Sequence, residues 1–286
     1  MARPSFWCLR ALVALVGLWL VVPAVGLFAQ SGLDPSGSRR RAKGAPVAPV
    51  FEGWEPNRDG TFNLYFGYQN RNWDEEIDIP VGPDNSFSPG PADRGQPTHF
   101  LVNRQKLVFA VVVPKDFGNQ TLVWTLVAHG STQTVPGKLS PILQIDTTKD
   151  ENNVAPALNV GAPQTIVWPN AATLRATVTS GRDETVTQNA GRGARAGRPS
   201  RLTIKWTKYR GPGTVTFADA APPVKDGRAA TTATFSEPGI YVLHALADEG
   251  SRGDATQSGG IPGFLCCWTN AQLTVVVKAP DQGGGK

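Results

Sequence analysis

Apolar and polar residues alternate in many short stretches of the chain. In the segment 62–69, large apolar side chains fall on every second position, with Asn63, Tyr65 and Gln69 between them. A period of two is typical of a β-strand with one buried face. Similar alternation occupies segments 122–128, 173–179, 202–207, 232–236, 241–247 and 273–277. No segment has a helical period longer than one turn, so the pattern predicts an all-β protein.

Segments without alternation indicate how the chain is divided. Residues 146–156 (DTTKDENNVAP) are polar and acidic and end in proline, which is typical of an interdomain linker. We therefore expect one β-sandwich at 50–145 and a second at 157–279, each long enough to bury its own core. Both are expected to be Ig-like or fibronectin-like antiparallel sandwiches. Residues 30–49 are expected to be a flexible tether, and residues 280–286 a flexible tail.

Residues 1–29 have the layout of a secretory signal peptide. Arg3 and Arg10 supply a positive start, an apolar stretch follows, and Ala29 offers a small residue for cleavage. The alternative is an uncleaved membrane anchor, because the stretch approaches the roughly 20 residues that span a bilayer. We expect cleavage and export to the periplasm, cell surface or extracellular space. Contact with a membrane is expected only if the leader is retained.

Composition supports a β-rich fold and argues against nucleic acid as a partner. The chain has 31 glycines and 24 prolines, which punctuate the apolar stretches as turn residues do. Its formal charge is +5, and two of these charges are the leader arginines, so the remainder carries a mild excess. A nucleic-acid-binding domain has a much stronger basic footprint.

A set of short motifs marks the second predicted domain. These are ATL at 172–174, Trp206, GPGTVTF at 211–217, TATF at 232–235, PGIYVL at 238–243, AD at 247–248 and the strand 273–277. With this set the domain resembles PKD-type repeats, an Ig-like β-sandwich family of extracellular proteins. Trp206 then fits the buried tryptophan of strand C, and Tyr241 fits a tyrosine corner.

The resemblance implies a module for spacing, adhesion, or protein and glycan contact, without catalytic residues to carry over. The first predicted domain resembles β-domains of uncharacterised secreted bacterial proteins, and that likeness implies no activity. Fold alone underdetermines function.

Four aromatic residues in the first predicted domain are candidates for binding a glycan or a partner: Trp54, Tyr65, Tyr68 and Trp73. Tyr65 lies on the polar face of its strand, and Trp73 lies in a charged loop. Exposed rings on a sheet face can form a binding platform. The alternative is that these rings cap the core or cover an edge of the sandwich.

The linker is a candidate calcium site, and calcium is the one cofactor that the sequence suggests. Its oxygen-bearing side chains are Asp146, Asp150, Glu151, Asn152 and Asn153. Hard cations prefer such oxygens, although no EF-hand spacing is present. A solvated acidic linker is the alternative.

Cys266 and Cys267 end a glycine-rich insertion at 249–268. Export would place them in an oxidising compartment. A strained vicinal disulfide, a bridge to another chain and two free thiols remain the alternatives. A second insertion at 181–200 is rich in arginine and could contact an anionic polysaccharide or membrane, or be a solvated loop.

The three histidines, His99, His129 and His244, belong to no metalloprotease or nucleophile-elbow motif. We expect them to be ordinary strand or loop residues. A copper site built from His244 and a cysteine is disfavoured because the chain's one methionine is Met1. A dispersed active site would require a pocket in which a histidine meets an acidic residue or a cysteine.

These observations favour a non-enzymatic, exported binding or structural module of the bacterial cell envelope. Its partner would be an envelope protein or a polysaccharide. The alternatives are a carbohydrate-binding accessory protein with an exposed aromatic face and an enzyme with a dispersed active site. An envelope component linked through Cys266 or Cys267 is a further alternative.

Overall fold

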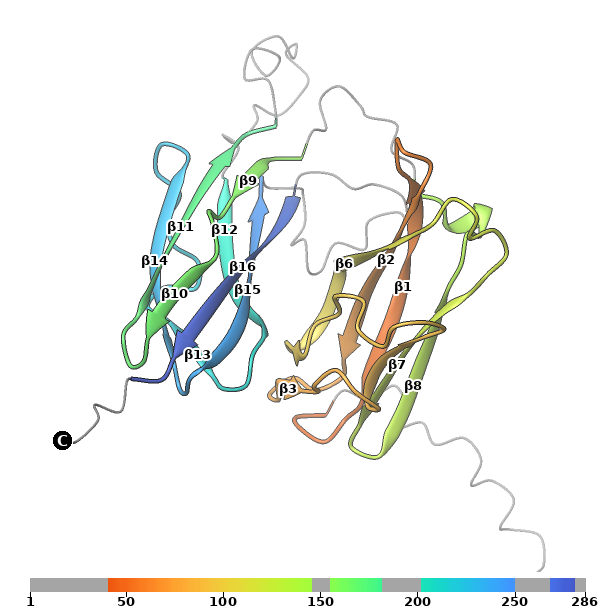
Figure 1. Ribbon diagram of the computed structural model, residues 1–286, viewed down its shortest axis with the longest axis horizontal. Helices are drawn as coiled ribbons and strands as arrows, with labels where there is room; N and C mark the ends of the chain where they lie inside the picture. The colour runs from red at the N-terminus through yellow and green to blue at the C-terminus, as the bar shows by residue number, and fades with distance from the viewer. Residues whose placement is uncertain (1–40, 146–154, 182–201, 250–267, 281–286) are drawn as a thin grey trace, which may run out of the picture. The chain divides into compact units, whose positions relative to one another are not determined.

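The computed structural model describes residues 41–145, 155–181, 202–249 and 268–280, and it confirms the all-β prediction (Figure 1). The one helical element in these ranges is a single 3-10 turn, η2 (Pro141–Leu143). The remaining elements are strands that pack as two β-sandwiches, each around its own hydrophobic cluster.

The first sandwich packs two antiparallel three-stranded sheets on each other. One sheet has the order β1-β2-β6, formed by β1 (Val47–Pro56), β2 (Phe62–Asn70) and β6 (Asn103–Val113). The other has the order β4-β7-β8, formed by β4 (Asn85–Ser88), β7 (Leu122–Ala128) and β8 (Ser131–Gly137). Inward-facing rings fill the space between them, and Phe66 of β2 packs edge-on against Phe87 of β4 and Trp124 of β7.

A third, two-stranded sheet completes this sandwich and positions the site described below. It pairs β3 (Ile77–Asp78) with β5 (His99–Phe100) in antiparallel register. Phe100 is fully buried in the first core, whereas Asp78 is exposed.

The ordered structure begins earlier than the expected Val50, so the predicted tether at 30–49 is too long. Strand β1 starts at Val47, which is fully buried. Before it, the backbone of Ala45 exchanges two hydrogen bonds with the Asn72 side chain, at 2.7 and 2.8 Å. The proline in this strand, Pro49, obscured the strand pattern, yet proline is tolerated because β1 is an edge strand.

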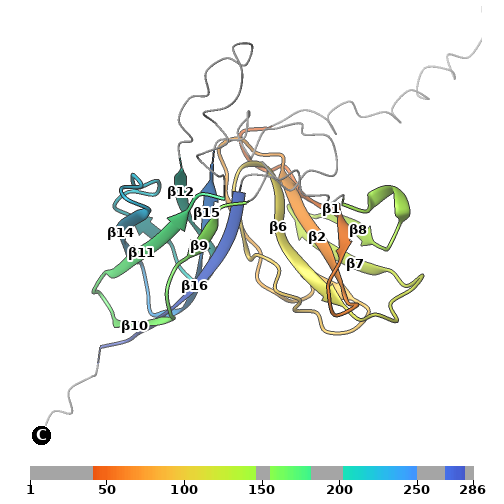
Figure 2. The same ribbon diagram turned by 90° about the horizontal axis from the view of Figure 1, so that it is seen from above.

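The second sandwich consists of two four-stranded sheets, which form separate layers in Figure 2. One has the order β13-β14-β11-β9, formed by β13 (Val215–Phe217), β14 (Arg228–Phe235), β11 (Ala172–Thr179) and β9 (Ala157–Asn159). The other has the order β10-β16-β15-β12, formed by β10 (Gln164–Val167), β16 (Trp268–Lys278), β15 (Gly239–Asp248) and β12 (Thr203–Arg210). Only β10 and β16 pair in parallel among these described strands. This order is that of an immunoglobulin-like sandwich with a split first strand.

Two aromatic residues lie at the centre of the second core. Trp206 on β12 is 1% exposed and Tyr241 on β15 is fully buried. The Tyr241 hydroxyl donates a hydrogen bond to the carbonyl of Glu237 at 2.9 Å, and the amide of Gly213 donates to it at 3.2 Å. A tyrosine held to upstream backbone in this way fixes the corner before its strand.

Candidate functional site at the edge of strand β12

Two carboxylates and a histidine lie on one face of the β3–β5 pair. Successive strand residues point to opposite sides, so Glu76 and Asp78 project outward while Ile77 and Ile79 point inward. His99 is the register partner of Asp78 and shares its face. Pairing of these two short strands therefore places the imidazole of His99 between two carboxylates that are distant from it in sequence.

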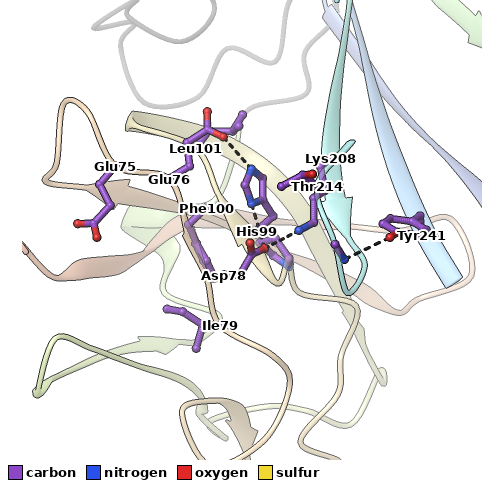
Figure 3. A network of polar contacts seen from close by, with 12 residues as sticks. Glu75, Glu76, Asp78, Ile79, His99, Phe100, Leu101, Lys208, Thr214 and Tyr241 are labelled. Carbon is purple, nitrogen blue, oxygen red and sulfur yellow. Dashed lines mark hydrogen bonds and ion pairs between the residues drawn. The ribbon is translucent and has the colours of Figure 1, made fainter. Parts of the chain in front are cut away.

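Both nitrogens of His99 contact a carboxylate (Figure 3). Nε2 lies 3.0 Å from Oε2 of Glu76, and Nδ1 lies 3.0 Å from Oδ1 of Asp78. Burial lowers the pKa of His99, but the hydrogen bonds to Asp78 and Glu76 outweigh it and leave the pKa above its ordinary value. The two carboxylates therefore favour the imidazolium form, which donates both of its N–H groups.

The pKa values of the two carboxylates shift downward, opposite to that of His99. The hydrogen bond from His99 lowers the pKa of Glu76 below its usual value. Burial raises the pKa of Asp78, yet the hydrogen bonds from His99 and Lys208 prevail and lower it. Both carboxylates are thus ionised at neutral pH.

Lys208 reaches this cluster from the second sandwich. Its ammonium lies 2.8 Å from Oδ1 of Asp78, and its side chain is 5% exposed. Lysine is rarely buried to this extent without a partner. Asp78 is therefore a shared acceptor for one cation from each sandwich (Figure 3).

The two residues after Lys208 also contact the first sandwich. Tyr209 donates its hydroxyl to the carbonyl of Gly95 at 2.6 Å, and its own carbonyl accepts from the amide of Thr98 at 3.0 Å. The Arg210 guanidinium makes a bidentate pair with Asp93 at 2.8 and 3.0 Å. The register of β12 shifts between Lys208 and Arg210, and such a bulge re-aims side chains that would otherwise alternate.

A cavity of about 480 Å³ opens beside these contacts. Its polar wall includes the Glu76, Asp78 and His99 side chains, and its apolar wall includes Val215 and Phe217 of β13. The volume lies within the range of roughly 300–1,000 Å³ found for small-molecule sites.

The four candidate aromatic residues do not form a shared exposed platform, which corrects that prediction. Trp54 and Tyr68 belong to the first core, at 9% and 2% exposure. Tyr65 is half-buried and donates its hydroxyl to Glu55. Only Trp73 among the four is exposed, at 56%. The rings of Trp54 and Tyr68 lie in the core because strands β1 and β2 turn these two positions inward.

The other candidate sites lie outside the described residues. These are Cys266 and Cys267, the arginine-rich insertion, and the linker oxygens of Asp146, Asp150, Glu151, Asn152 and Asn153. Within the described ranges, no group of three or more His, Cys, Asp or Glu residues could hold a metal ion. The calcium and disulfide hypotheses stay predictions.

The histidines differ from one another in their surroundings. His129 lies 3.2 Å from Glu75 at the exposed turn after β7. His244 packs its ring on Tyr209, with centroids 5.7 Å apart, and burial lowers its pKa to about 4. His99 is the histidine that meets acidic residues beside a cavity, and its role was missed because its partners lie 21 and 23 residues away.

Comparison with known proteins assigns no family to the chain. No protein-family model and no curated protein matches it. One similar solved structure is the crystal structure of domains 4 and 5 of the S-layer protein SbsC, at 13% identity and a TM-score of 0.26. The match covers 82% of this chain and 98% of the other. At this TM-score the likeness carries no argument about function.

A second similar structure is a protein of unknown function from Porphyromonas gingivalis W83. It is 8% identical with a TM-score of 0.22, and the match covers 82% of this chain and all of the other. It is equally uninformative about function. Within the described ranges, no helix has the length and apolar character that crossing a membrane requires.

Proposed function

We propose that this protein is a non-enzymatic structural module of the bacterial cell envelope, in which two β-sandwiches act as one rigid unit. The observation that carries this proposal is the packing of Tyr209, on the edge strand β12 of the second sandwich, into the core of the first. Tyr209 is 3% exposed and belongs to the hydrophobic core cluster of the first sandwich.

Domains joined only by a linker move relative to each other unless a substantial interface holds them. Here the interface has an apolar centre, formed by Tyr209 and by Val242 of β15, which also packs against the first core. Polar contacts surround it on several sides. Besides those of β12, the side-chain amide of Asn270 on β16 donates to the carbonyl of Leu107 on β6 at 3.2 Å. Such an arrangement favours a fixed angle between the sandwiches, as a spacer requires.

The arrangement of His99 supports a structural role rather than catalysis. A general base must have a nitrogen free to take a proton from a substrate. Both nitrogens of His99 are held at 3.0 Å by carboxylates, whose hydrogen bonds raise its pKa and favour the protonated ring. The cluster therefore resembles an ion-pair network that joins two domains more than an acid–base site.

The sequence supports the location and the broad class. The leader at 1–29 predicts export, and the resemblance of residues 163–277 to PKD-type repeats implies an extracellular spacing or contact module. A rigid pair of sandwiches would keep the envelope components attached to it at a constant distance from each other.

Unfolding cooperativity tests the proposal. We expect the chain from Gln30 onward to unfold in one calorimetric transition, because neither sandwich can open without exposing the interface. Tyr209→Ala should split this transition in two and destabilise the first sandwich by about 3 kcal/mol, the usual cost of removing a buried aromatic ring. Arg210→Ala leaves the core intact. It should weaken the coupling between the sandwiches and broaden the unfolding transition without dividing it into two.

Tyr65→Ala is the matched control, because Tyr65 is a half-buried tyrosine of the first sandwich whose hydroxyl bonds to Glu55 and Asn63 of that sandwich. It should lower the transition temperature of the protein while leaving one transition. Two independent transitions in the wild-type protein would overturn the proposal.

A further inference from the structure

The cavity beside β12 contains polar groups that the interface leaves unused. Oδ1 of Asp78 serves both His99 and Lys208, and Oε2 of Glu76 serves His99. Within the described chain, Oδ2 of Asp78 and Oε1 of Glu76 accept no hydrogen bond. Lys205, which also lines the cavity, is exposed and forms no ion pair with a described residue. The cavity thus offers both free acceptors and a free donor.

The charges around the cavity are of both signs and nearly balance. Two carboxylates and three cations line it when His99 is protonated, and the half-buried His99 and the buried Lys208 lie against the carboxylates. An anion would meet the free carboxylate oxygens, and a cation would meet Lys205, Lys208 and protonated His99. A neutral ligand avoids both penalties.

The opposite wall is apolar and partly aromatic. Val215 and Phe217 are half-buried residues of the edge strand β13, and Leu101 adds an aliphatic surface from the first sandwich. Trp206 also lines the cavity, and its buried indole nitrogen has no hydrogen-bond partner among the residues that the structure describes. Small-ligand sites combine such apolar walls with a few well-placed polar groups.

We propose that this cavity binds a neutral, hydroxyl-rich ligand of the size of one or two sugar residues. Each sugar hydroxyl can donate to a carboxylate oxygen and accept from an ammonium, while the C–H face of the ring packs against Phe217. The site is distinct from the aromatic residues that the sequence suggested, and it lies where the two sandwiches meet. It goes beyond a structural role, because it gives the rigid unit a ligand.

Titration with a defined panel of sugars tests this proposal. The probes are N-acetylglucosamine, cellobiose and maltose as neutral ligands, with glucuronate and glucosamine as charged counterparts. We expect at least one neutral sugar to shift the backbone amide resonances of β12 and β13 at millimolar concentration. Both charged counterparts should bind more weakly than the neutral sugars.

Lys205→Ala and Glu76→Gln should each weaken this binding by about tenfold, the effect of losing one hydrogen bond to a charged group. Arg175→Ala is the matched control, because Arg175 is an exposed cation on β11 that does not line the cavity. It should leave the affinity unchanged.

Absence of shifts with every neutral sugar, or tighter binding of a charged sugar, would overturn the proposal. Lys205 acts on Glu76 through its charge but forms no hydrogen bond or ion pair with a described residue of the first sandwich, so Lys205→Ala should leave the calorimetric transition single. Failure of ligand binding and failure of domain coupling are therefore separate outcomes.

Discussion

Asp78 is the residue on which the polar contacts between the sandwiches converge. One of its oxygens accepts from His99 of its own sandwich and from Lys208 of the other. The carboxylate is half-exposed, whereas the lysine is 5% exposed. Because the two partners differ in burial, removing one or the other has unequal consequences for stability.

Asp78→Asn is expected to destabilise the protein more than Lys208→Met. The first change leaves a buried ammonium without its counter-charge, at a cost of about 3 kcal/mol. The second leaves a carboxylate that water and His99 still stabilise, at a cost of about 1 kcal/mol. Urea unfolding at neutral pH measures both values. Equal effects would contradict the unequal burial of the pair.

The ion pairs of His99 predict how stability depends on pH. Its pKa in the folded protein is raised, so its contribution is fully present below the ordinary histidine pKa of about 6.5 and is lost as pH rises through the folded value. The contribution of Glu76 and Asp78, whose pKa values are lowered, is present above about pH 4 and is lost on further acidification.

We therefore expect the difference in unfolding free energy between wild type and His99→Gln to be largest between about pH 5 and 6.5. It should shrink toward pH 9. Because His244 and the other titrating groups are present in both proteins, the difference isolates His99. A difference that grows with pH would show that the histidine is held neutral.

At the scale of elements, the turn between β12 and β13 depends on a glycine packed on a tyrosine. Gly211 has a φ of +145°, and a Cβ atom there would lie 2.2 Å from Cδ1 of Tyr241. Gly161 has a φ of +79° with open space around it. Comparing alanine substitutions at the two glycines therefore separates the cost of backbone strain at positive φ from the cost of a steric clash.

Gly161→Ala should cost about 1 kcal/mol, the strain of a side chain at positive φ. Gly211→Ala should cost about 2–3 kcal/mol more, because the ring of Tyr241 must move and its contacts in the corner loosen. Chemical denaturation of the two variants gives this comparison. Equal losses would mean that the corner accommodates the methyl group.

Alternation predicted most strands because a strand with one buried and one exposed face has apolar and polar residues at alternate positions. Strand β7 and strand β11 are examples, each with buried residues at every second position. The first domain begins earlier than the predicted residue 50, because β1 starts at Val47 and its first residues, which include Ala48 and Pro49, lack a clear alternation. Alternation in β12 also ends at Lys208, where the strand has a bulge. The next residue, Tyr209, packs into the core of the other sandwich, and no local pattern in the sequence indicates such a contact.

The polar cluster was invisible in the sequence for a related reason. Glu76 and Asp78 alternate as exposed strand residues do, and nothing local shows that a two-residue strand at 99–100 pairs with them. The aromatic candidates show the opposite error. Their closeness in sequence suggested a platform, but strand alternation sends Trp54 and Tyr68 into the core.

At the scale of the whole molecule, both the proposed structural role and the proposed ligand site require the two sandwiches to keep a fixed orientation relative to each other. The contacts that support it come from three separate strands, β12, β15 and β16, of the second sandwich. A ligand in the adjoining cavity would contact residues of both sandwiches, so it would find its site already assembled only if the unit is rigid.

The most direct measurement is the distance distribution between two spin labels, one on each sandwich. Ile142 and Ile240 are suited to labelling because they are 91% and 64% exposed, and the native cysteines would be replaced by serine. The account predicts one narrow distance distribution in the otherwise wild-type protein, unchanged by Lys205→Ala and broadened by Tyr209→Ala. A broad or multiple distribution before any interface residue is changed would contradict it.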